Sequence, residues 1–271
     1  MTEENISFLS NDGFKLEGTL HKSQQTQYAV LFVHGITVDR EEDGFYTEFS
    51  KKLDSINVTS FRFDLRAHGK SEGKFSEVTL IGVINDIDSA YRVLKKNISE
   101  NIPIIIIAAS FGAGLSANWV AKNSNYVKSL ILLNPLLDYG KRMLFDKPQY
   151  WKNESLTAKA INELKENHFL PHGDFQIGRS LLNELFYIRP YQTMQKINIP
   201  VLTIHGDEDS MVPYDIAKHY ALVNAESDFV TIPGADHGFV HPDDEDYTHP
   251  ETISNREIVF NKVIEWIKKI K

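Results

Sequence analysis

The 271-residue sequence contains no cysteine, and it lacks several other features that would define a class of protein. Without cysteine there is no disulfide, no thiol nucleophile and no thiolate ligand for zinc. Residues 1–5 show neither the basic nor the apolar region of a signal peptide, and no apolar run approaches the length of a membrane span. No internal repeat or low-complexity tract stands out. We therefore expect a cytoplasmic globular protein without a membrane segment.

An excess of basic residues is also absent. Lysine and arginine number 29 against 37 aspartate and glutamate residues, which gives a formal charge of −8 at pH 7. This balance argues against nucleic acid or an anionic membrane surface as a partner. With 42% hydrophobic residues, a chain of this length can bury roughly 70–75% of its unfolded surface, which is enough for one main core.

One serine stands in an unusual local setting. A β-branched run over residues 102–107 ends in Ala108 and Ala109, and Ser110 is followed by the small residues Gly112 and Gly114. This pattern predicts a buried strand, a sharp turn and a helix. Such a turn holds the serine in a strained, exposed position and aims the first N–H groups of the helix at whatever the serine attacks. Ser110 is therefore our candidate nucleophile, although Ala108 stands where the common G-x-S-x-G pattern has glycine.

Two further polar clusters follow predicted strands. An apolar run over residues 199–204 leads into a loop with Asp207 and Asp209, and residues 229–232 lead into Asp236 and His237. The chain order is therefore Ser, Asp, His, and each of these residues lies just beyond the end of a strand. This is the α/β-hydrolase order, which differs from the orders of the chymotrypsin and subtilisin triads.

On these residues the chain resembles the α/β-hydrolase superfamily from near Tyr28 to its C-terminus. Residues 29–37 contain the His34-Gly35 segment that follows an early strand, and residues 64–71 resemble a D-x-R-G-H-G-x-S loop in which Ala67 replaces a glycine. Within the superfamily, these loops are most similar to those of cinnamoyl/feruloyl esterases and related small carboxylesterases. The resemblance implies a serine hydrolase with an oxyanion hole made by the backbone N–H groups of Ile36 and Phe111.

The alternation of elements predicts an α/β fold with a mostly parallel twisted sheet and helices on both faces. A hairpin of residues 6–10 and 15–21 around the Asn-Asp-Gly turn at residues 11–13 should open the sheet. We expect strands and helices alternately up to residue 133, and a last helix over residues 254–270. Residues 138–196 break this alternation and are rich in aromatic residues, so we interpret them as a helical cap inserted into a core formed by residues 1–137 and 197–271.

Ser110, His237 and Asp209 have distinct predicted roles. Ser110 attacks a carbonyl, His237 takes and returns the proton, and Asp209 orients the imidazole. Asp207 and Asp236 are alternative acids, although Asp236 is adjacent to His237 in the chain and adjacent side chains rarely face one another. His241 is an alternative base. We expect His34, His68 and His205 to structure loops rather than bind metal, and no cofactor or metal is expected. Asp64 and Arg66 are expected to form an internal ion pair or to tether their loop, and the small Ala109 is expected to widen the acyl pocket.

The sequence thus favours a serine hydrolase that cleaves small or medium acyl or aromatic esters, with cap aromatics contacting the substrate. The same triad serves thioesterases, acyltransferases, peptidases and carbon–carbon bond hydrolases, so these activities remain alternatives. A non-catalytic binding protein with this fold is a further alternative. We expect a small-molecule ester as the partner, and a monomer or homodimer.

Overall fold

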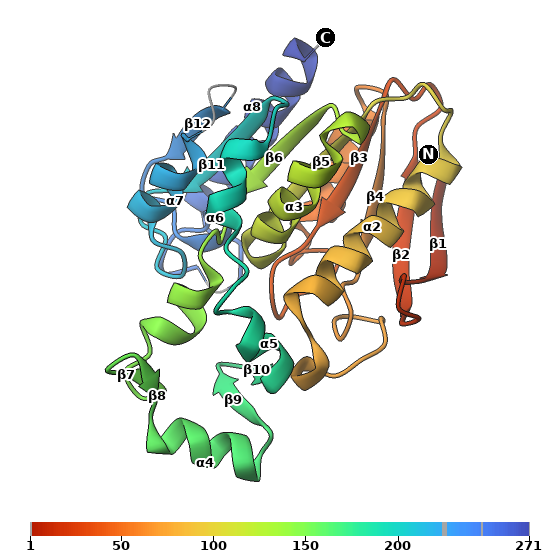
Figure 1. Ribbon diagram of the computed structural model, residues 1–271. Helices are drawn as coiled ribbons and strands as arrows, with labels where there is room; N and C mark the ends of the chain where they lie inside the picture. Colours follow the sequence, from red (N-terminus) through yellow and green to blue (C-terminus); the bar gives the residue numbers. More distant parts are fainter. Residues whose placement is uncertain (1, 224–226, 245, 271) are drawn as a thin grey trace.

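The computed structural model describes residues 2–223, 227–244 and 246–270. Its centre is an eight-stranded sheet with the order β1-β2-β4-β3-β5-β6-β11-β12 (Figure 1). These strands are β1 (Thr2–Leu9), β2 (Lys15–Lys22), β3 (Tyr28–Val33), β4 (Val58–Phe63), β5 (Ile104–Ala109), β6 (Ser129–Leu133), β11 (Val201–Gly206) and β12 (Ser227–Ile232). The strands from β4 to β12 in this order pair in parallel, whereas β1 and β2 pair antiparallel. The predicted mostly parallel α/β fold is confirmed.

The antiparallel edge begins earlier than the apolar pattern indicated. We expected the first strand to start at Ile6, but β1 pairs with β2 from Thr2 opposite Lys22. Main-chain pairing continues through the polar residues at the start of β1 because an edge strand needs no buried face there. The turn closes as predicted, with the Ser10 N–H donating to the Phe14 carbonyl at 2.8 Å.

Helices cover both faces of the sheet. The covering helices are α1 (Phe45–Asp54), α2 (Leu80–Asn97), α3 (Ser110–Asn123), α7 (Tyr214–Ala221) and α8 (Pro250–Lys269). Three further helices, α4 (Ala158–Glu166), α5 (Arg179–Glu184) and α6 (Pro190–Thr193), belong to residues 138–196. Alternate strand residues serve the two faces: Leu31 packs in the core with α2 and α3, and Phe32 packs in the core with α1 and α8. None of the helices in the described part of the chain is both long and apolar enough to cross a bilayer.

The last helix starts at Pro250 rather than at the expected Ser254. Pro250 occupies the first turn, where its missing N–H needs no partner. The ring of His249 accepts the Glu251 N–H at 3.2 Å and caps the helix. Apolar spacing misses such a start because the first turn of α8 is polar.

Residues 138–196 form small elements at the end of the sheet where the parallel strands finish (Figure 1). They comprise the π-helical turn η3 (Lys141–Phe145), a hairpin of β7 (Trp151–Lys152) and β8 (Ser155–Leu156), a hairpin of β9 (Phe169–His172) and β10 (Phe175–Gly178), and α4 to α6, followed by η4 (Met194–Lys196). The β9–β10 hairpin contacts the core, since Phe175 lies 5.2 Å from Phe75 between ring centroids and 6.3 Å from Phe111. This segment, hereafter the cap segment, is more irregular than the expected helical cap because it contains two hairpins, and its status as a separate insertion stays a prediction.

Candidate active site

Ser110 lies at the point where β5 ends and α3 begins. Its φ is 46°, in the left-handed region, and 8% of its surface is exposed. The two following glycines allow the helix to approach neighbouring loops. A Cβ on Gly112 would lie 2.4 Å from the His34 carbonyl oxygen, and one on Gly114 would lie 2.3 Å from the Leu136 carbonyl oxygen. The turn is therefore tight, as the sequence pattern predicted, and its strain is located at the serine itself.

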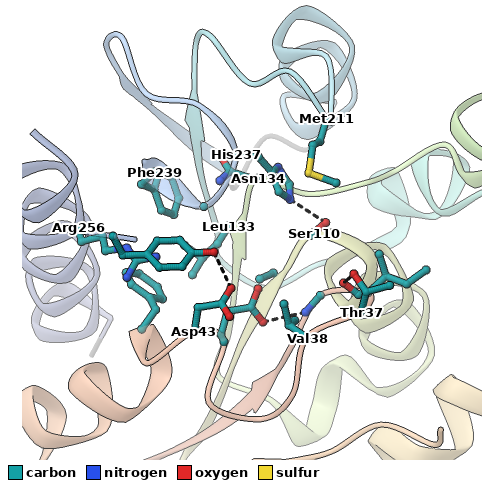
Figure 2. Close-up of a pocket in the computed structure, with 17 residues that line it drawn as sticks. Thr37, Val38, Asp43, Ser110, Leu133, Asn134, Met211, His237, Phe239 and Arg256 are labelled. Atoms are coloured by element: carbon teal, nitrogen blue, oxygen red, sulfur yellow. Dashed lines mark hydrogen bonds between the residues drawn. The ribbon is translucent and has the colours of Figure 1, made fainter. Parts of the chain in front are cut away.

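A chain of hydrogen bonds joins Ser110 to His237 and Asp209, and Figure 2 shows its bond between Ser110 and His237. The Ser110 Oγ lies 3.0 Å from the His237 Nε2, and the His237 Nδ1 lies 2.7 Å from the Asp209 Oδ2. A carboxylate can only accept, so the Nδ1 carries the proton and the Nε2 lone pair is free to accept from the serine hydroxyl. The three residues follow β5, β12 and β11, respectively, and the fold brings their loops to one edge of the sheet.

Asp209 is buried, and each of its two carboxylate oxygens accepts two hydrogen bonds. Its Oδ1 accepts the N–H groups of Met211 at 2.9 Å and Val212 at 2.7 Å, and its Oδ2 also accepts from the His205 Nε2 at 3.1 Å. Burial by itself raises the pKa of Asp209, but the hydrogen bonds from His205, His237 and Val212 hold this pKa well below its ordinary value. The carboxylate therefore stays ionised across the neutral range and can stabilise a positive imidazole.

His205 was expected to structure a loop, and its direct bond to Asp209 was not foreseen. The ring is completely buried, and its Nε2 also lies 3.0 Å from the Val212 carbonyl oxygen. His205 is the fifth residue of β11 and precedes Asp209 by four positions. The sequence signal was only this short spacing, which does not reveal that the chain turns back on itself after the strand.

The alternative acids, Asp207 and Asp236, link the loop after β11 to the loop after β12. Asp207 accepts the Gly234 N–H at 2.7 Å. Asp236 accepts the Ser210 N–H at 2.7 Å and the His237 N–H at 2.6 Å. Of the three candidate acids, Asp209 is the one whose carboxylate meets the His237 ring.

His34 and Glu42 shape the loop that follows β3. The Leu65 N–H donates to the His34 Nε2 at 2.9 Å, so the Nδ1 carries the proton and bonds the Gly35 carbonyl at 2.6 Å. The Glu42 Oε2 accepts the Gly35 N–H at 2.8 Å. Ile36 follows Gly35 and lines the same cavity as Ser110. Phe111 is the second residue of α3, where a main-chain N–H has no acceptor within its own helix.

The cavity beside Ser110 has a volume of about 220 Å³. Its aromatic walls are Phe45, Phe239 and Tyr247, and none of its lining residues belongs to the cap segment (Figure 2). No aromatic residue of the cap segment lines this cavity, so the expectation that cap aromatics contact the substrate stays a prediction. The cap aromatics pack largely among themselves, as in the cluster of Phe145, Trp151 and Phe186. Ala109 does line the cavity, at the position from which we expected it to widen the acyl pocket.

Charged groups also reach this cavity. Glu42 and Asp43 line it together with Arg256, whose guanidinium stacks over the rings of Phe45 at 5.3 Å and Tyr247 at 4.6 Å. Burial raises the pKa of Glu42 to about 7, although the bond from the Gly35 N–H opposes this shift. Sequence reasoning missed these residues because no local pattern marks them. The left-handed φ values of Glu42, Asp43 and Gly44, at 47°, 52° and 81°, bring this loop to the cavity.

The expected ion pair between Asp64 and Arg66 does not form. Asp64 instead pairs with Arg40 at 2.5 Å, and Arg66 pairs with Asp86 at 2.7 Å and Asp12 at 2.8 Å. Both residues still tether their loop, through partners that are distant in the sequence.

One group of three side chains in the described part of the chain has the proximity a metal site needs. His241, His249 and Glu251 place one ligand atom each within 4.8 Å of one another. However, the Nδ1 atoms of His241 and His249 accept the N–H groups of Asp243 and Glu251 at 3.3 and 3.2 Å. This places the remaining ring proton on each Nε2, the nitrogen that would have to bind a metal. His34, His68 and His205, which we expected to structure loops, lie outside this group.

Family models match the whole chain from residue 24 onward. The model described as serine aminopeptidase, S33 matches residues 24–176, and that of the dienelactone hydrolase family matches residues 177–271.

Three individual proteins illustrate the similarity, at 24–26% sequence identity. The lysophosphatidylserine lipase ABHD12 of Danio rerio is 26% identical over 208 residues, which are 75% of this chain and 49% of that protein. The chain thus spans about half the length of that relative. The uncharacterized protein YfhR of Salmonella typhi is 24% identical over 86% of this chain and 74% of its own. The structure of Est1E from Butyrivibrio proteoclasticus with bound ferulic acid is 25% identical, covers 97% of this chain and 100% of its own, and superposes with a TM-score of 0.75.

Proposed function

This chain belongs to the serine aminopeptidase S33 family within the α/β-hydrolase superfamily and is a hydrolase, and on that premise we propose that it cleaves carboxylic esters through an acyl-enzyme. The observation that carries the proposal is the hydrogen-bonded chain of Ser110, His237 and Asp209 on the wall of a cavity. Similarity to Est1E, whose structure holds ferulic acid, supports an ester with a small or aromatic acyl group.

In this mechanism the Ser110 Oγ attacks the ester carbonyl and gives its proton to the His237 Nε2. The Asp209 carboxylate, 2.7 Å from the His237 Nδ1, stabilises the imidazolium. The N–H groups of Ile36 and Phe111 donate to the oxyanion, and each such donor contributes on the order of 10²–10³ in rate. His237 then protonates the departing alcohol. Finally, a water molecule gives a proton to His237 and attacks the acyl carbonyl. His237 returns that proton to the Ser110 Oγ as the carboxylic acid is released.

A peptidase is the second candidate, and one feature of the cavity favours it. The matching family model carries the name serine aminopeptidase, and the carboxylates of Glu42 and Asp43 line the cavity beside Ser110. A free peptide N-terminus is a cation that such carboxylates bind. Hydrolysis of aminoacyl nitroanilides in preference to nitrophenyl esters of the same acyl size would establish this activity instead.

A fluorophosphonate probe tests the nucleophile directly. We expect the wild-type protein to be labelled and Ser110→Ala to remain unlabelled, with turnover of nitrophenyl and cinnamate esters reduced by about 10⁴-fold or more. Ser116→Ala is the matched control, because Ser116 is a buried serine of the same helix outside the cavity. If the folded wild-type protein is neither labelled nor active on esters, the esterase proposal fails and a binding protein with this fold becomes the better account.

A further inference from the structure

A second cavity adjoins the one that holds Ser110. It has a volume of about 380 Å³ and shares Ile36, Thr37 and Met211 with the first cavity. Its remaining walls come from the cap segment, and they include the aromatic rings of Tyr150 and Phe175. A substrate whose reacting carbonyl lies at Ser110 can therefore extend past the three shared residues into this second space.

Basic side chains gather on the wall of the second cavity. Arg142 comes from η3, Lys147 follows that turn, and His172 ends β9, and all three are half-buried. Within the described ranges, neither Arg142 nor Lys147 forms an ion pair. The carboxylate in the lining is that of Asp174, which is exposed, and Asp146 lies next to Lys147 in the chain.

Among the residues that the structure describes, Arg142 and Lys147 act on each other and on His172 as positive charges without a paired carboxylate. Burial, together with smaller effects of Arg142 and Lys147, lowers the pKa of His172 to about 4. Burial and Arg142 also lower the pKa of Lys147, against a smaller opposing effect of Asp146. Arg142 and Lys147 are two cations close together in a protein of net charge −8, so they repel one another and lose hydration, whereas His172 with its lowered pKa is neutral at pH 7. An anion between them would relieve both costs.

We propose that this second cavity binds an anionic group of the substrate, a carboxylate or a phosphate, while the ester carbonyl lies at Ser110. The inference rests on the proposed esterase function and adds the class of substrate. The guanidinium of Arg142 suits either anion, because its parallel N–H groups match two oxygens. The rings of Tyr150 and Phe175 suit the apolar portion between the anion and the ester.

Matched pairs of esters test this inference. In the first pair the acyl chain of a nitrophenyl glutarate monoester ends in a carboxylate or in the corresponding amide. In the second pair the anion is on the alcohol, as in the acetate esters of 4-hydroxyphenylacetic acid and of its amide. We expect the anionic member of at least one pair to have about tenfold higher kcat/KM than its amide, and this ratio to fall with added salt.

Charge-removing variants show where that preference arises. Arg142→Gln and Lys147→Gln should each lower the ratio by about fivefold, the effect of one partly exposed ion pair. Lys141→Gln and Lys152→Gln remove equal charge from exposed neighbouring positions outside the second cavity and should leave the ratio within about twofold of wild type. Equal hydrolysis of both members of both pairs by the wild-type protein would overturn the anion site alone. Failure to hydrolyse any of the esters would overturn the esterase function itself.

Discussion

At the scale of single residues, Glu42 is the most unusual group of the site. Its carboxylate accepts the Gly35 N–H and lines the cavity of Ser110. Because burial raises its pKa from 4.5 to about 7, the folded protein keeps the Glu42 proton over a range where the unfolded chain has lost it. The free energy of unfolding therefore falls as pH rises from about 4.5 through about 7.

Glu42→Gln should remove this dependence. The amide keeps an acceptor for the Gly35 N–H but has no charge to bury, so we expect the variant to gain about 1–2 kcal/mol over wild type at pH 8 and little at pH 4.5. Urea unfolding at several pH values measures the difference. Glu48→Gln, on the exposed side of α1, is the control and should follow the wild-type curve. If wild type and Glu42→Gln stay parallel from pH 4.5 to pH 8, Glu42 does not titrate as described.

Residues whose placement follows from their position along the chain could be predicted from the sequence. Ser110, Asp209 and His237 were singled out because each directly follows a strand, and the fold brings the ends of parallel strands together. Ala67 was recognised as standing in a glycine position, and its φ of 65° is one that glycine adopts more easily. Arg256 and Tyr247 could not be predicted, because loop geometry and the packing of α8 bring them to the cavity.

At the scale of elements, the β9–β10 hairpin holds the cap segment against the core. Gly178 ends β10, and a Cβ at this position would lie 2.0 Å from the Ser76 carbonyl oxygen. The neighbouring loop η1 (Phe75–Glu77) also contacts the hairpin through Phe75 and Phe175. The hairpin therefore needs a residue without a side chain at this point.

Gly178→Ala should force the hairpin away from η1. We expect a loss of about 1–3 kcal/mol in the free energy of unfolding and faster proteolysis within the cap segment. Gly173→Ala is a matched change in the same hairpin, since Gly173 has a φ of 58° and open space around it. That variant should lose only the conformational cost of about 1 kcal/mol, with proteolysis unchanged. A Gly178→Ala protein as stable as wild type would show that the hairpin is not packed this closely.

The regular elements of the core were predictable and those of the cap segment were not. Runs such as Ile104–Ala109 carry a continuous apolar signal because both of their faces are buried. The two-residue strands β7 and β8 are too short to show any periodicity. The start of α8 was missed for a related reason, because the start of a helix is marked by its capping residue and not by its apolar face.

At the scale of the whole molecule, Arg66 joins parts of the chain that are far apart in sequence. It pairs with Asp86 of α2 and with Asp12 in the turn between β1 and β2, and its guanidinium lies over the ring of Phe14 at 4.7 Å. Asp86 is completely buried, and burial raises its pKa although Arg66 opposes that shift. One cation therefore holds the N-terminal hairpin, the loop after β4 and α2 together.

Arg66→Met should leave the buried Asp86 carboxylate without its partner and cost about 3–5 kcal/mol of unfolding free energy at pH 7. The double variant Arg66→Met, Asp86→Asn should recover part of that loss, because the uncompensated charge is gone. The penalty of the single variant should also shrink as pH falls and Asp86 takes up a proton. Urea unfolding of the three proteins measures these differences, and a double variant less stable than Arg66→Met would contradict the account.

The cavity beside Ser110 is built without any residue of the cap segment, whereas the adjoining cavity takes most of its walls from it. Under the proposed function, bond cleavage and substrate choice would therefore lie on separate stretches of the sequence. An exchange of residues 138–196 for the equivalent segment of another hydrolase would replace the selecting surface and leave the bond-cleaving surface as it is. Such a division lets evolution, or a protein engineer, vary one surface while the other stays under constant selection.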